Sequence, residues 1–243
     1  MEGNPIGTKG VDIEDYAKKG PQYYSGEIPL LLKEYLKFKN YSSLLDCGCG
    51  DGATLYALKT QSFLENKKVY ALDLSKSRIE IIKQIDSRIK AFIDNAETML
   101  NIKDDSIDFF ISLQVIEHVM DQTRMLNCID RVVKKGGIVY LSTVFKKWYG
   151  WYFYRNNGRW VLDPTHLREY GKDSELLELI DKEKFEILEN KKSLLFFPII
   201  DFFVKRLHIK NRNLYNNKFL RLIRKIKRPI IGYYNWEIVL RKR

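Results

Sequence analysis

Apolar runs alternate with amphipathic segments along the first 144 residues of the chain. The runs lie in SSLLDCG, KKVYALDLS, IKAFIDNA, SIDFFISLQVI and GGIVYLSTV. Between them, segments such as SKSRIEIIKQI carry apolar residues at helical spacing, and this one begins with a serine suited to cap a helix. Parallel strands that are covered by helices on both faces read as apolar throughout. The pattern therefore predicts an α/β fold built from βαβ units around a mostly parallel sheet.

The regular alternation ends after Val144, and the rest of the chain is organised differently. Residues of about 145–172 are aromatic and basic without a clean period, which predicts a cap loop. A strand in KFEILENKKSLLFF precedes a basic amphipathic insertion of about 197–228, and a final strand covers about 232–241. No repeat or low-complexity linker interrupts the chain. We therefore predict a single domain over residues 1–243 with a core of about 27–196.

A glycine-rich stretch, LLDCGCGDG, follows the first predicted strand and opens a helix. Backbone N–H groups at such a turn can approach and bind a nucleotide cofactor. Gly48, Gly50 and Ala53 satisfy the G-x-G-x-x-G/A pattern of dinucleotide-binding proteins. Gly48, Gly50 and Gly52 satisfy G-x-G-x-G with Asp46 just before them. A carboxylate at Asp46 repels a pyrophosphate and can pair with the ammonium of S-adenosylmethionine, which favours the second interpretation.

Asp73 ends the second predicted strand, 21 residues after Gly52. An acid at this separation typically binds the ribose hydroxyls of either cofactor. A cap for the next helix is the alternative role for Asp73. The dehydrogenase alternative therefore stays open on these residues alone.

Several stretches together resemble the class I S-adenosylmethionine-dependent methyltransferases, in the UbiE/UbiG-like, type 11 group. They are LDCGCGDG, ALDLS, DNAE, SIDFFISLQVIEHV and KKGGIVYLSTV, within roughly 41–144. The resemblance implies S-adenosyl-L-methionine as cofactor and a Rossmann-like, seven-stranded sheet whose last strand, YNWEIVLRK, is antiparallel. In the DNAE stretch many relatives carry aspartate where this chain has Asn95, so either Asp94 or the Asn95 amide would meet the adenine. The cofactor-binding residues implied in this way are Asp46, Gly48, Gly50, Gly52, Asp73, Leu74, Asp94, Asn95, Ala96, Leu113 and Gln114.

Glu117 and His118 follow the fourth predicted strand, at the sheet edge where ligands bind. The ubiquinone O-methyltransferase branch of the family has E-x-x-E-H there and uses it for a divalent metal. In this chain Gln114 replaces the first acid, and the loss of one anionic ligand weakens such a site, so we predict no metal. The alternative role for both residues is structural.

His166, in DPTHLREY, is the first candidate for a general base, and His118 is the second. The segment follows the aromatic stretch and precedes a helix, so it is expected to fold over the cofactor. Asp163 or Arg168 would position the acceptor. In the alternative interpretation, Asp163 caps a loop and His166 is simply hydrogen-bonded.

Positive charge is concentrated at the C-terminal end of the chain. Residues 198–243 hold 13 of the 42 Lys and Arg residues and only 2 acids, so they account for the whole net charge of +11. A basic amphipathic helix beside the apolar LLFFPIIDFFV is typical of a protein that binds an anionic membrane at its interface. Packing of that helix on the sheet is the alternative, and we do not expect nucleic acid as a partner.

These features predict an enzyme that methylates a small-molecule or lipid-linked acceptor, such as a quinone, isoprenoid or glycan intermediate. The alternative is a non-catalytic protein of the same fold docked to membrane or RNA. The sparse cysteines and the absence of a signal-peptide pattern in MEGNPIGTKG lead us to expect a cytoplasmic protein at the inner membrane face.

Overall fold

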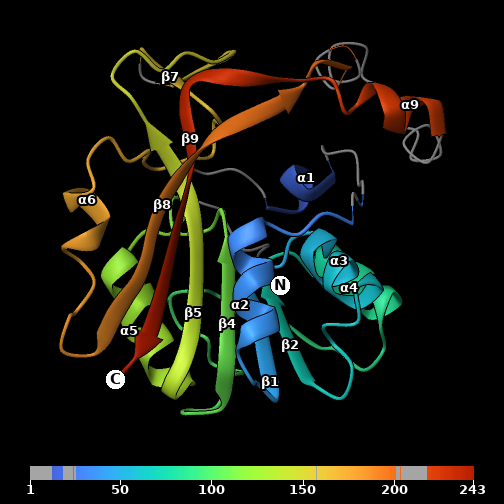
Figure 1. Cartoon of the computed structure of the whole chain (residues 1–243), viewed down its shortest axis with the longest axis vertical. Helices are drawn as coiled ribbons and strands as arrows, with labels where there is room; N and C mark the ends of the chain where they lie inside the picture. Colours follow the sequence, from blue (N-terminus) through green and yellow to red (C-terminus); the bar gives the residue numbers. More distant parts are fainter. Residues whose placement is uncertain (1–12, 19–23, 25, 157, 201–202, 204–217) are drawn as a thin grey trace, which may run out of the picture.

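A mixed seven-stranded sheet with the order β3-β2-β1-β4-β5-β9-β8 forms the centre of the molecule (Figure 1). The computed structural model describes residues 13–18, 24, 26–156, 158–200, 203 and 218–243. The first five strands are parallel, and β9 is antiparallel to both of its neighbours, which confirms the predicted fold class. The strands of the sheet are β1 (Ser43–Cys47), β2 (Lys68–Asp73), β3 (Lys90–Ile93), β4 (Ile107–Leu113), β5 (Val133–Lys146), β8 (Phe185–Pro198) and β9 (Lys227–Lys242).

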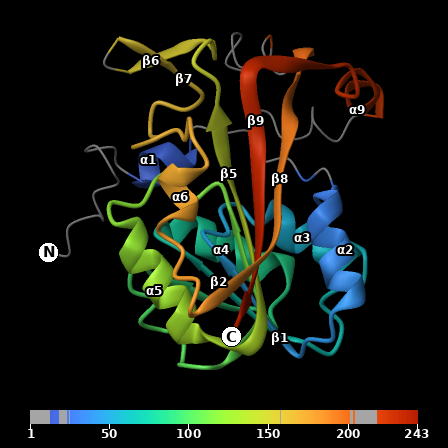
Figure 2. The same cartoon turned by 60° about the vertical axis from the view of Figure 1, so that its left-hand side comes forward.

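Helices cover both faces of this sheet, as Figure 2 shows. On one face lie α2 (Leu30–Phe38), α3 (Ala53–Thr60) and α4 (Lys76–Ile85), and on the other lie α5 (Gln122–Val132) and α6 (Ser174–Leu177). Each face has its own buried apolar cluster. In β1, for example, Leu44 packs into the cluster beneath α2, α3 and α4, and Leu45 packs into the cluster beneath α5 and α6. A strand buried on both sides must be apolar at every position, which explains the short apolar runs in the sequence.

The N-terminal helix α1 (Ile13–Lys18) lies near the carboxyl end of β2 (Figure 1). The Glu14 carboxylate accepts hydrogen bonds from the N–H groups of Lys76 and Ser77 at the start of α4. Ser75 caps the same helix by accepting from the N–H of Arg78, as its sequence predicted. Acidic and hydroxyl groups thus satisfy the free N–H groups at this helix start.

The structure corrects two details after Val144. The predicted cap loop contains a small hairpin of β6 (Tyr154–Asn156) and β7 (Arg159–Val161), with Gly158 at positive φ between them. The final strand begins at Lys227, so the end of the predicted insertion is strand. The predicted helix is described only as α9 (Lys218–Ile223), and the segment before it lies outside the described residues.

Strands β8 and β9 continue beyond the end of β5 as a two-stranded arm (Figures 1 and 2). The arm packs on the loop after β5 at Gly232. Only glycine fits at this position, because a Cβ there would lie 2.6 Å from the Gly150 Cα. A third buried cluster of Val144, Tyr152, Ile230 and Tyr233 holds loop and arm together. Among the described residues, no helix is both long and apolar enough to cross a membrane.

Candidate active site

Two groups of polar residues meet at the carboxyl edge of the parallel strands, where α/β proteins bind ligands. The first group comes from the loop between β1 and α3 and from the end of β2. The second comes from the segment after β4 and from the cap around His166. Val115 connects them, because its side chain lies against Gly48 and it precedes Glu117 by two residues.

The glycine loop is shaped by close packing on two sides and by open space on a third. A Cβ at Gly48 would lie 2.4 Å from Val115, and one at Gly52 would lie 2.4 Å from Ile85. At Gly50 a Cβ would meet no atom within 4 Å. All three glycines have positive φ, which side chains disfavour. The N–H of Gly50 donates to Oδ2 of Asp73 over 3.0 Å, so the loop is fixed to the end of β2.

Asp46, the second-last residue of β1, is fully buried, and its Oδ2 has no hydrogen-bond partner among the described residues. Burial, together with the negative charge of Asp73, raises the pKa of Asp46 to about 7. A buried carboxylate with an unsatisfied oxygen beside a second carboxylate is stabilised by a cation. The loop therefore offers a site for a positively charged group.

Asp73 is buried and serves the loop as well as the following helix. Its Oδ1 accepts from the N–H of Ser75, and its Oδ2 lies 3.6 Å from Nη1 of Arg78. Leu74 next to it is half-buried. Tyr24 approaches from the N-terminal segment, donates to the carbonyl of Asp51 and stacks on Tyr56. Ser75, and not Asp73, is the N-cap of α4, so the helix-cap alternative for Asp73 is wrong. The ribose role of Asp73 stays a prediction, since both of its oxygens accept backbone N–H groups of Gly50 and Ser75.

The hydrogen bonds of the loop after β3 bear on whether Asp94 or Asn95 is available to contact the adenine. Both carboxylate oxygens of Asp94 accept hydrogen bonds within this loop, from the N–H groups of Asn95 and Asn101. Oδ1 of Asn95 accepts from the N–H of Glu97, which leaves its Nδ2 as the donor. Ala96 is buried in the core beneath. Which of the two residues meets the adenine stays a prediction, and Asn95 is the one whose side chain keeps a donor, Nδ2, for it.

Leu113 and Gln114, at the end of β4, differ in where they point. Leu113 packs on the cluster that includes Cys49 of the glycine loop. Gln114 has a positive φ of 57°, and its Nε2 donates to Oδ1 of Asn235 in β9 over 3.2 Å. The side chain of Gln114 thus reaches across the end of β5, and only Leu113 turns toward the glycine loop.

The second group centres on Glu117, which is fully buried after β4. Its Oε2 accepts from the hydroxyl of Thr143 over 2.8 Å, and its Oε1 has no hydrogen-bond partner among the described residues. Burial raises the pKa of Glu117 to about 7, against the opposing effect of His166, whose Nε2 lies 4.0 Å from Oε1. The structure therefore gives Glu117 an electrostatic role that the sequence interpretation as a helix-start carboxylate missed.

His166 is buried beneath the cap and is held between two carboxylates. Its Nδ1 lies 3.0 Å from Oε1 of Glu169, and its ring meets the ring of His118 edge to face at 4.8 Å. Burial and the neighbouring His166 lower the pKa of His118 to about 4, so His118 is neutral at pH 7. Sequence reasoning missed Glu169, although the spacing of His and Glu in HLRE offered the signal.

The two residues expected to position an acceptor have structural partners instead. Oδ1 of Asp163 accepts from the N–H and the hydroxyl of Thr165, which supports the loop-cap alternative. Arg168 donates to the carbonyls of Val119 and Met120 and so fixes the segment after Glu117. Its guanidinium is therefore committed to the backbone of that segment.

Glu117, His118 and His166 each present one ligand atom within 4.8 Å of the others, a grouping that could hold a metal ion. Our prediction of no metal considered only the E-x-x-E-H positions and could not include His166, which lies almost 50 residues further along the chain. That prediction stays untested.

A comparison with protein families matches residues 45–141 to a methyltransferase domain. Over 162 residues the chain is 24% identical to the ubiquinone biosynthesis O-methyltransferase of Bartonella quintana, which covers 63% of this chain and 64% of that protein. Residues 45–141 thus form a methyltransferase domain, which supports the resemblance to the class I S-adenosylmethionine-dependent methyltransferases. The matched range contains the glycine loop, Asp73, Asp94 and Glu117.

Two solved structures share this methyltransferase fold over most of the chain. The [4+2]-cyclase SpnF has a TM-score of 0.64 at 18% identity, over 95% of this chain and 96% of that one. The phosphoethanolamine N-methyltransferase 2 of Haemonchus contortus, solved with phosphomonomethylethanolamine and S-adenosylhomocysteine, has a TM-score of 0.56 at 16% identity. It covers 87% of this chain and 51% of that one.

The residues of the glycine loop fit S-adenosylmethionine, the cofactor that the methyltransferase domain implies. The unsatisfied Oδ2 of Asp46 suits an ammonium, and the open side of Gly50 leaves room for the ligand. Two carboxylates at the loop suit a cationic amino acid and would repel a pyrophosphate. The dinucleotide alternative therefore loses its support.

Proposed function

We propose that this chain transfers a methyl group from S-adenosylmethionine to a hydroxyl of a small-molecule or lipid-linked acceptor. The observation that carries the proposal is the buried pair of Glu117 and His166 beside the cofactor loop. A hydroxyl becomes a strong nucleophile only when it loses its proton, so an O-methyltransferase benefits from a base near the reacting carbon. The cofactor, when bound, supplies the methyl group on an electrophilic sulfonium.

His166 is the proposed general base. The Glu169 carboxylate at Nδ1 orients the ring, and Nε2 is directed toward Glu117. His118 is a weaker candidate because a pKa of about 4 makes it a poor proton acceptor at pH 7. Glu117, with a pKa of about 7, can share the proton with His166. Burial of the pair excludes water, which would otherwise compete for the methyl group.

The acceptor class is proposed from the chemistry of the site and from the relatives. The relative from Bartonella quintana is named for O-methylation in ubiquinone biosynthesis. In this chain, aromatic rings of the cap stand near the site: Tyr152 packs on Tyr233, whose hydroxyl donates to Glu169. Aromatic rings packed beside the base suit an acceptor such as a quinone or an isoprenoid-linked phenol.

A two-step experiment tests the proposal. Calorimetry on the full chain compares S-adenosylmethionine with NADH, and we expect binding of the first alone. The chain is then incubated with deuterium-methyl-labelled cofactor and hydroxylated quinones or phenols, with the matching methyl ethers as controls. Mass spectrometry should find the label only on acceptors with a free hydroxyl. Binding of NADH would overturn the cofactor assignment, and label on amines alone would overturn the O-methylation.

The fold also carries chemistry other than methyl transfer, as the SpnF cyclase shows for its own chain. Tight binding of the cofactor without transfer to any of these acceptors would favour the non-methylating alternative for this chain.

A further inference from the structure

The end of the molecule farthest from the amino ends of the parallel strands exposes an unusual amount of apolar surface. Three segments form it: the loop and hairpin of 146–161, the end of β8 at 193–200, and the region of α9 and early β9 at 219–232. We call this the distal surface. Its exposed large apolar residues are Trp148, Tyr149, Trp151, Phe153, Tyr154, Leu194, Phe196, Ile199, Phe219, Leu222, Ile226 and Ile231.

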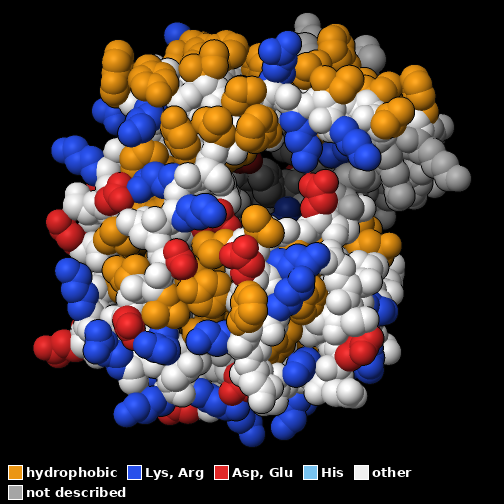
Figure 3. Space-filling model, in the orientation of Figure 1, with side chains coloured by type: hydrophobic (Ala, Val, Ile, Leu, Met, Phe, Trp, Pro, Cys, Tyr) orange, Lys and Arg blue, Asp and Glu red, His pale blue; other side chains and the backbone are white. Residues whose placement is uncertain are grey.

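These residues are additional to the apolar core of this end. The cluster around Tyr152 and Tyr233 already buries the inner face of loop and arm. Trp148 is nevertheless 94% exposed, Phe219 67% and Ile231 60%. Contiguous apolar surface of this kind marks an interaction site in a folded protein. Figure 3 shows such side chains gathered across the top of the molecule, from the β6–β7 side to α9.

The charge of the distal surface has a single sign. Its three segments contain no Asp or Glu, and they contain nine basic residues: Lys146, Lys147, Arg155, Arg159, Arg221, Arg224, Lys225, Lys227 and Arg228. Among the described side chains, Lys147, Arg155, Arg159, Lys225, Lys227 and Arg228 are exposed, and Nζ of Lys227 lies 3.4 Å from the carboxylate of Glu27 outside these segments. Figure 3 shows Lys and Arg side chains within and directly beneath the apolar layer. A partner must therefore be negatively charged at its surface and apolar just below.

We propose that the distal surface docks the chain on an anionic lipid bilayer. A bilayer presents phosphate groups above hydrocarbon, and it matches exposed Trp and Tyr mixed with Lys and Arg better than a nucleic acid does, because RNA offers no depth of hydrocarbon for Ile, Leu and Phe. The proposal goes beyond the proposed function and does not depend on methyl transfer.

The location of the distal surface gives this docking a consequence. It lies at the same end as the carboxyl edge of β4 and β5, and Figure 3 shows a hollow between the apolar layer and the rest of the molecule. Glu169, which holds His166, also contacts this end, because it lies 3.5 Å from Nζ of Lys146. Docking would therefore place the candidate active site next to the membrane, where a lipid-linked acceptor resides.

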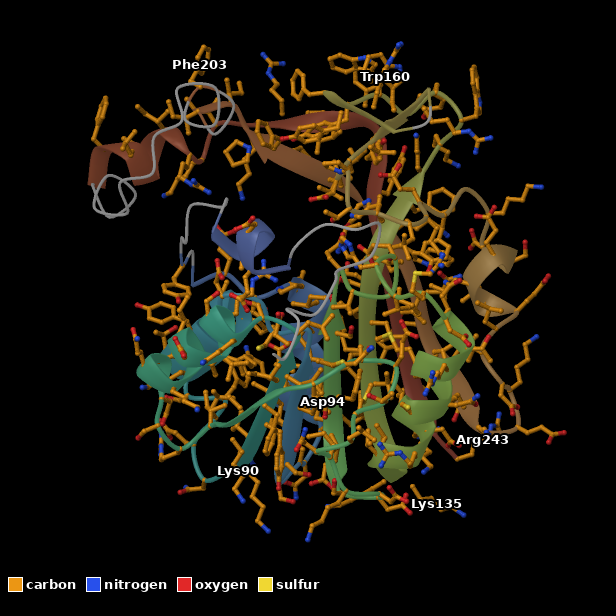
Figure 4. All side chains as sticks on the ribbon, turned by 180° about the vertical axis from the view of Figure 1, so that it is seen from behind. Lys90, Asp94, Lys135, Trp160, Phe203 and Arg243 are labelled. Atoms are coloured by element: carbon orange, nitrogen blue, oxygen red, sulfur yellow. The ribbon has the colours of Figure 1, made fainter. Side chains whose placement is uncertain are left out.

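Flotation of the full chain with lipid vesicles tests the proposal. We expect recovery with vesicles of phosphatidylcholine and phosphatidylglycerol, weak recovery with phosphatidylcholine alone, and a decrease with added salt. The variant Lys225→Glu/Arg228→Glu should lower the vesicle partition coefficient at least about tenfold. Its matched control is Lys90→Glu/Lys135→Glu, which makes the same charge change at the opposite end (Figure 4) and should leave partition nearly unchanged.

A second pair of variants tests the apolar part. Trp148→Ser should weaken recovery, whereas Phe38→Ser, at a residue that is 83% exposed on α2, should not. Thermal unfolding and calorimetry with S-adenosylmethionine on every variant show that it is folded, and they keep failure of the docking separate from failure of the proposed function.

Four results would overturn the docking. One is no flotation of the unaltered chain, and another is equal loss in both charge variants. The third is a dimer that light scattering detects and that Trp148→Ser dissociates, while the unaltered chain does not float with vesicles. This result would show that the distal surface binds a second copy of the chain. Retention on RNA without flotation would likewise assign it to nucleic acid.

Discussion

Asp46 and Glu117 are two fully buried carboxylates at one sheet edge, and their surroundings differ. Burial raises the pKa of each to about 7, and each keeps one oxygen without a hydrogen-bond partner among the described residues. The nearest charged influence on Asp46 is the carboxylate of Asp73, which raises its pKa further. For Glu117 it is the imidazole of His166, which lowers the pKa.

Burial of a carboxylate therefore has a different use at each of the two sites. Around Asp46 no described cation pairs with the carboxylate, since Arg78 lies against Asp73 and Asp51 instead, so a cationic ligand would stabilise it. Around Glu117 the protein supplies its own proton acceptor, so a proton can be taken up and held there without a ligand. The neighbouring residue, and not the degree of burial, distinguishes a cofactor anchor from a proton-transfer site.

The largest expected effect is on the proton-transfer side. His166→Ala should lower kcat about 10²–10⁴-fold, because a general base contributes that much to a reaction that needs one. The affinity for S-adenosylmethionine should stay the same, since His166 belongs to the other group of residues. Single-turnover kinetics with labelled cofactor measure the first quantity and calorimetry the second.

Added imidazole provides the control for this variant. It should restore part of the activity of His166→Ala by occupying the space of the missing ring. An equal loss of kcat and of cofactor affinity, without rescue, would show that His166 only supports the fold.

The next effect is on the cofactor side. Asp46→Asn should weaken the binding of S-adenosylmethionine about tenfold to a hundredfold, because a charge-assisted hydrogen bond to the ammonium is lost. Without cofactor, the variant should be at least as stable as the unaltered chain above pH 7, since an unpaired buried charge is removed. Calorimetry and thermal unfolding give the two values, and Glu117→Gln is the matched control that should bind the cofactor normally. If both variants bind equally well, the comparison between the two carboxylates fails.

The sequence predicted the first of these two sites better than the second. The glycine loop, Asp46 and Asp73 lie within about 30 residues, and each follows a strand whose apolar run is easy to recognise. Parallel strands end at one edge, so their adjacency followed from the fold class alone. The helix start at Ser75 was likewise local and was confirmed.

The second site depends on contacts between distant segments. Thr143 of β5 donates to Glu117, and the hydroxyl of Tyr233 in β9 donates to Glu169. A single sequence carries no signal for such pairs. For the same reason Arg168, which looked suited to an acceptor, instead binds carbonyls 48 and 49 residues away. The β6–β7 hairpin had a local signal in its Asn-Gly turn, but aromatic residues without a period hid it.

The smallest expected effect is a pH dependence that only the Asp46 site should show in cofactor binding. With a pKa of about 7, well above its ordinary value, Asp46 holds a proton below pH 7 in the free protein. A cationic ligand pairs with the ionised form, so binding must release that proton. Affinity should therefore fall by up to about tenfold per pH unit below pH 7 and level off above it.

Stability of the free protein should change in the opposite direction. The folded state binds this proton more tightly than the unfolded state, so the free energy of unfolding decreases as the pH rises from about 4 to about 7. Calorimetry in buffers with different protonation enthalpies counts the released proton. Asp46→Asn should abolish the pH dependence of cofactor affinity, and Glu117→Gln should keep it. Each variant alone should remove only part of the pH slope of stability, because the pKa of Glu117 is also raised to about 7. If cofactor affinity in Asp46→Asn still depends on pH in this way, a group other than Asp46 releases the proton and pairs with the cation of the cofactor.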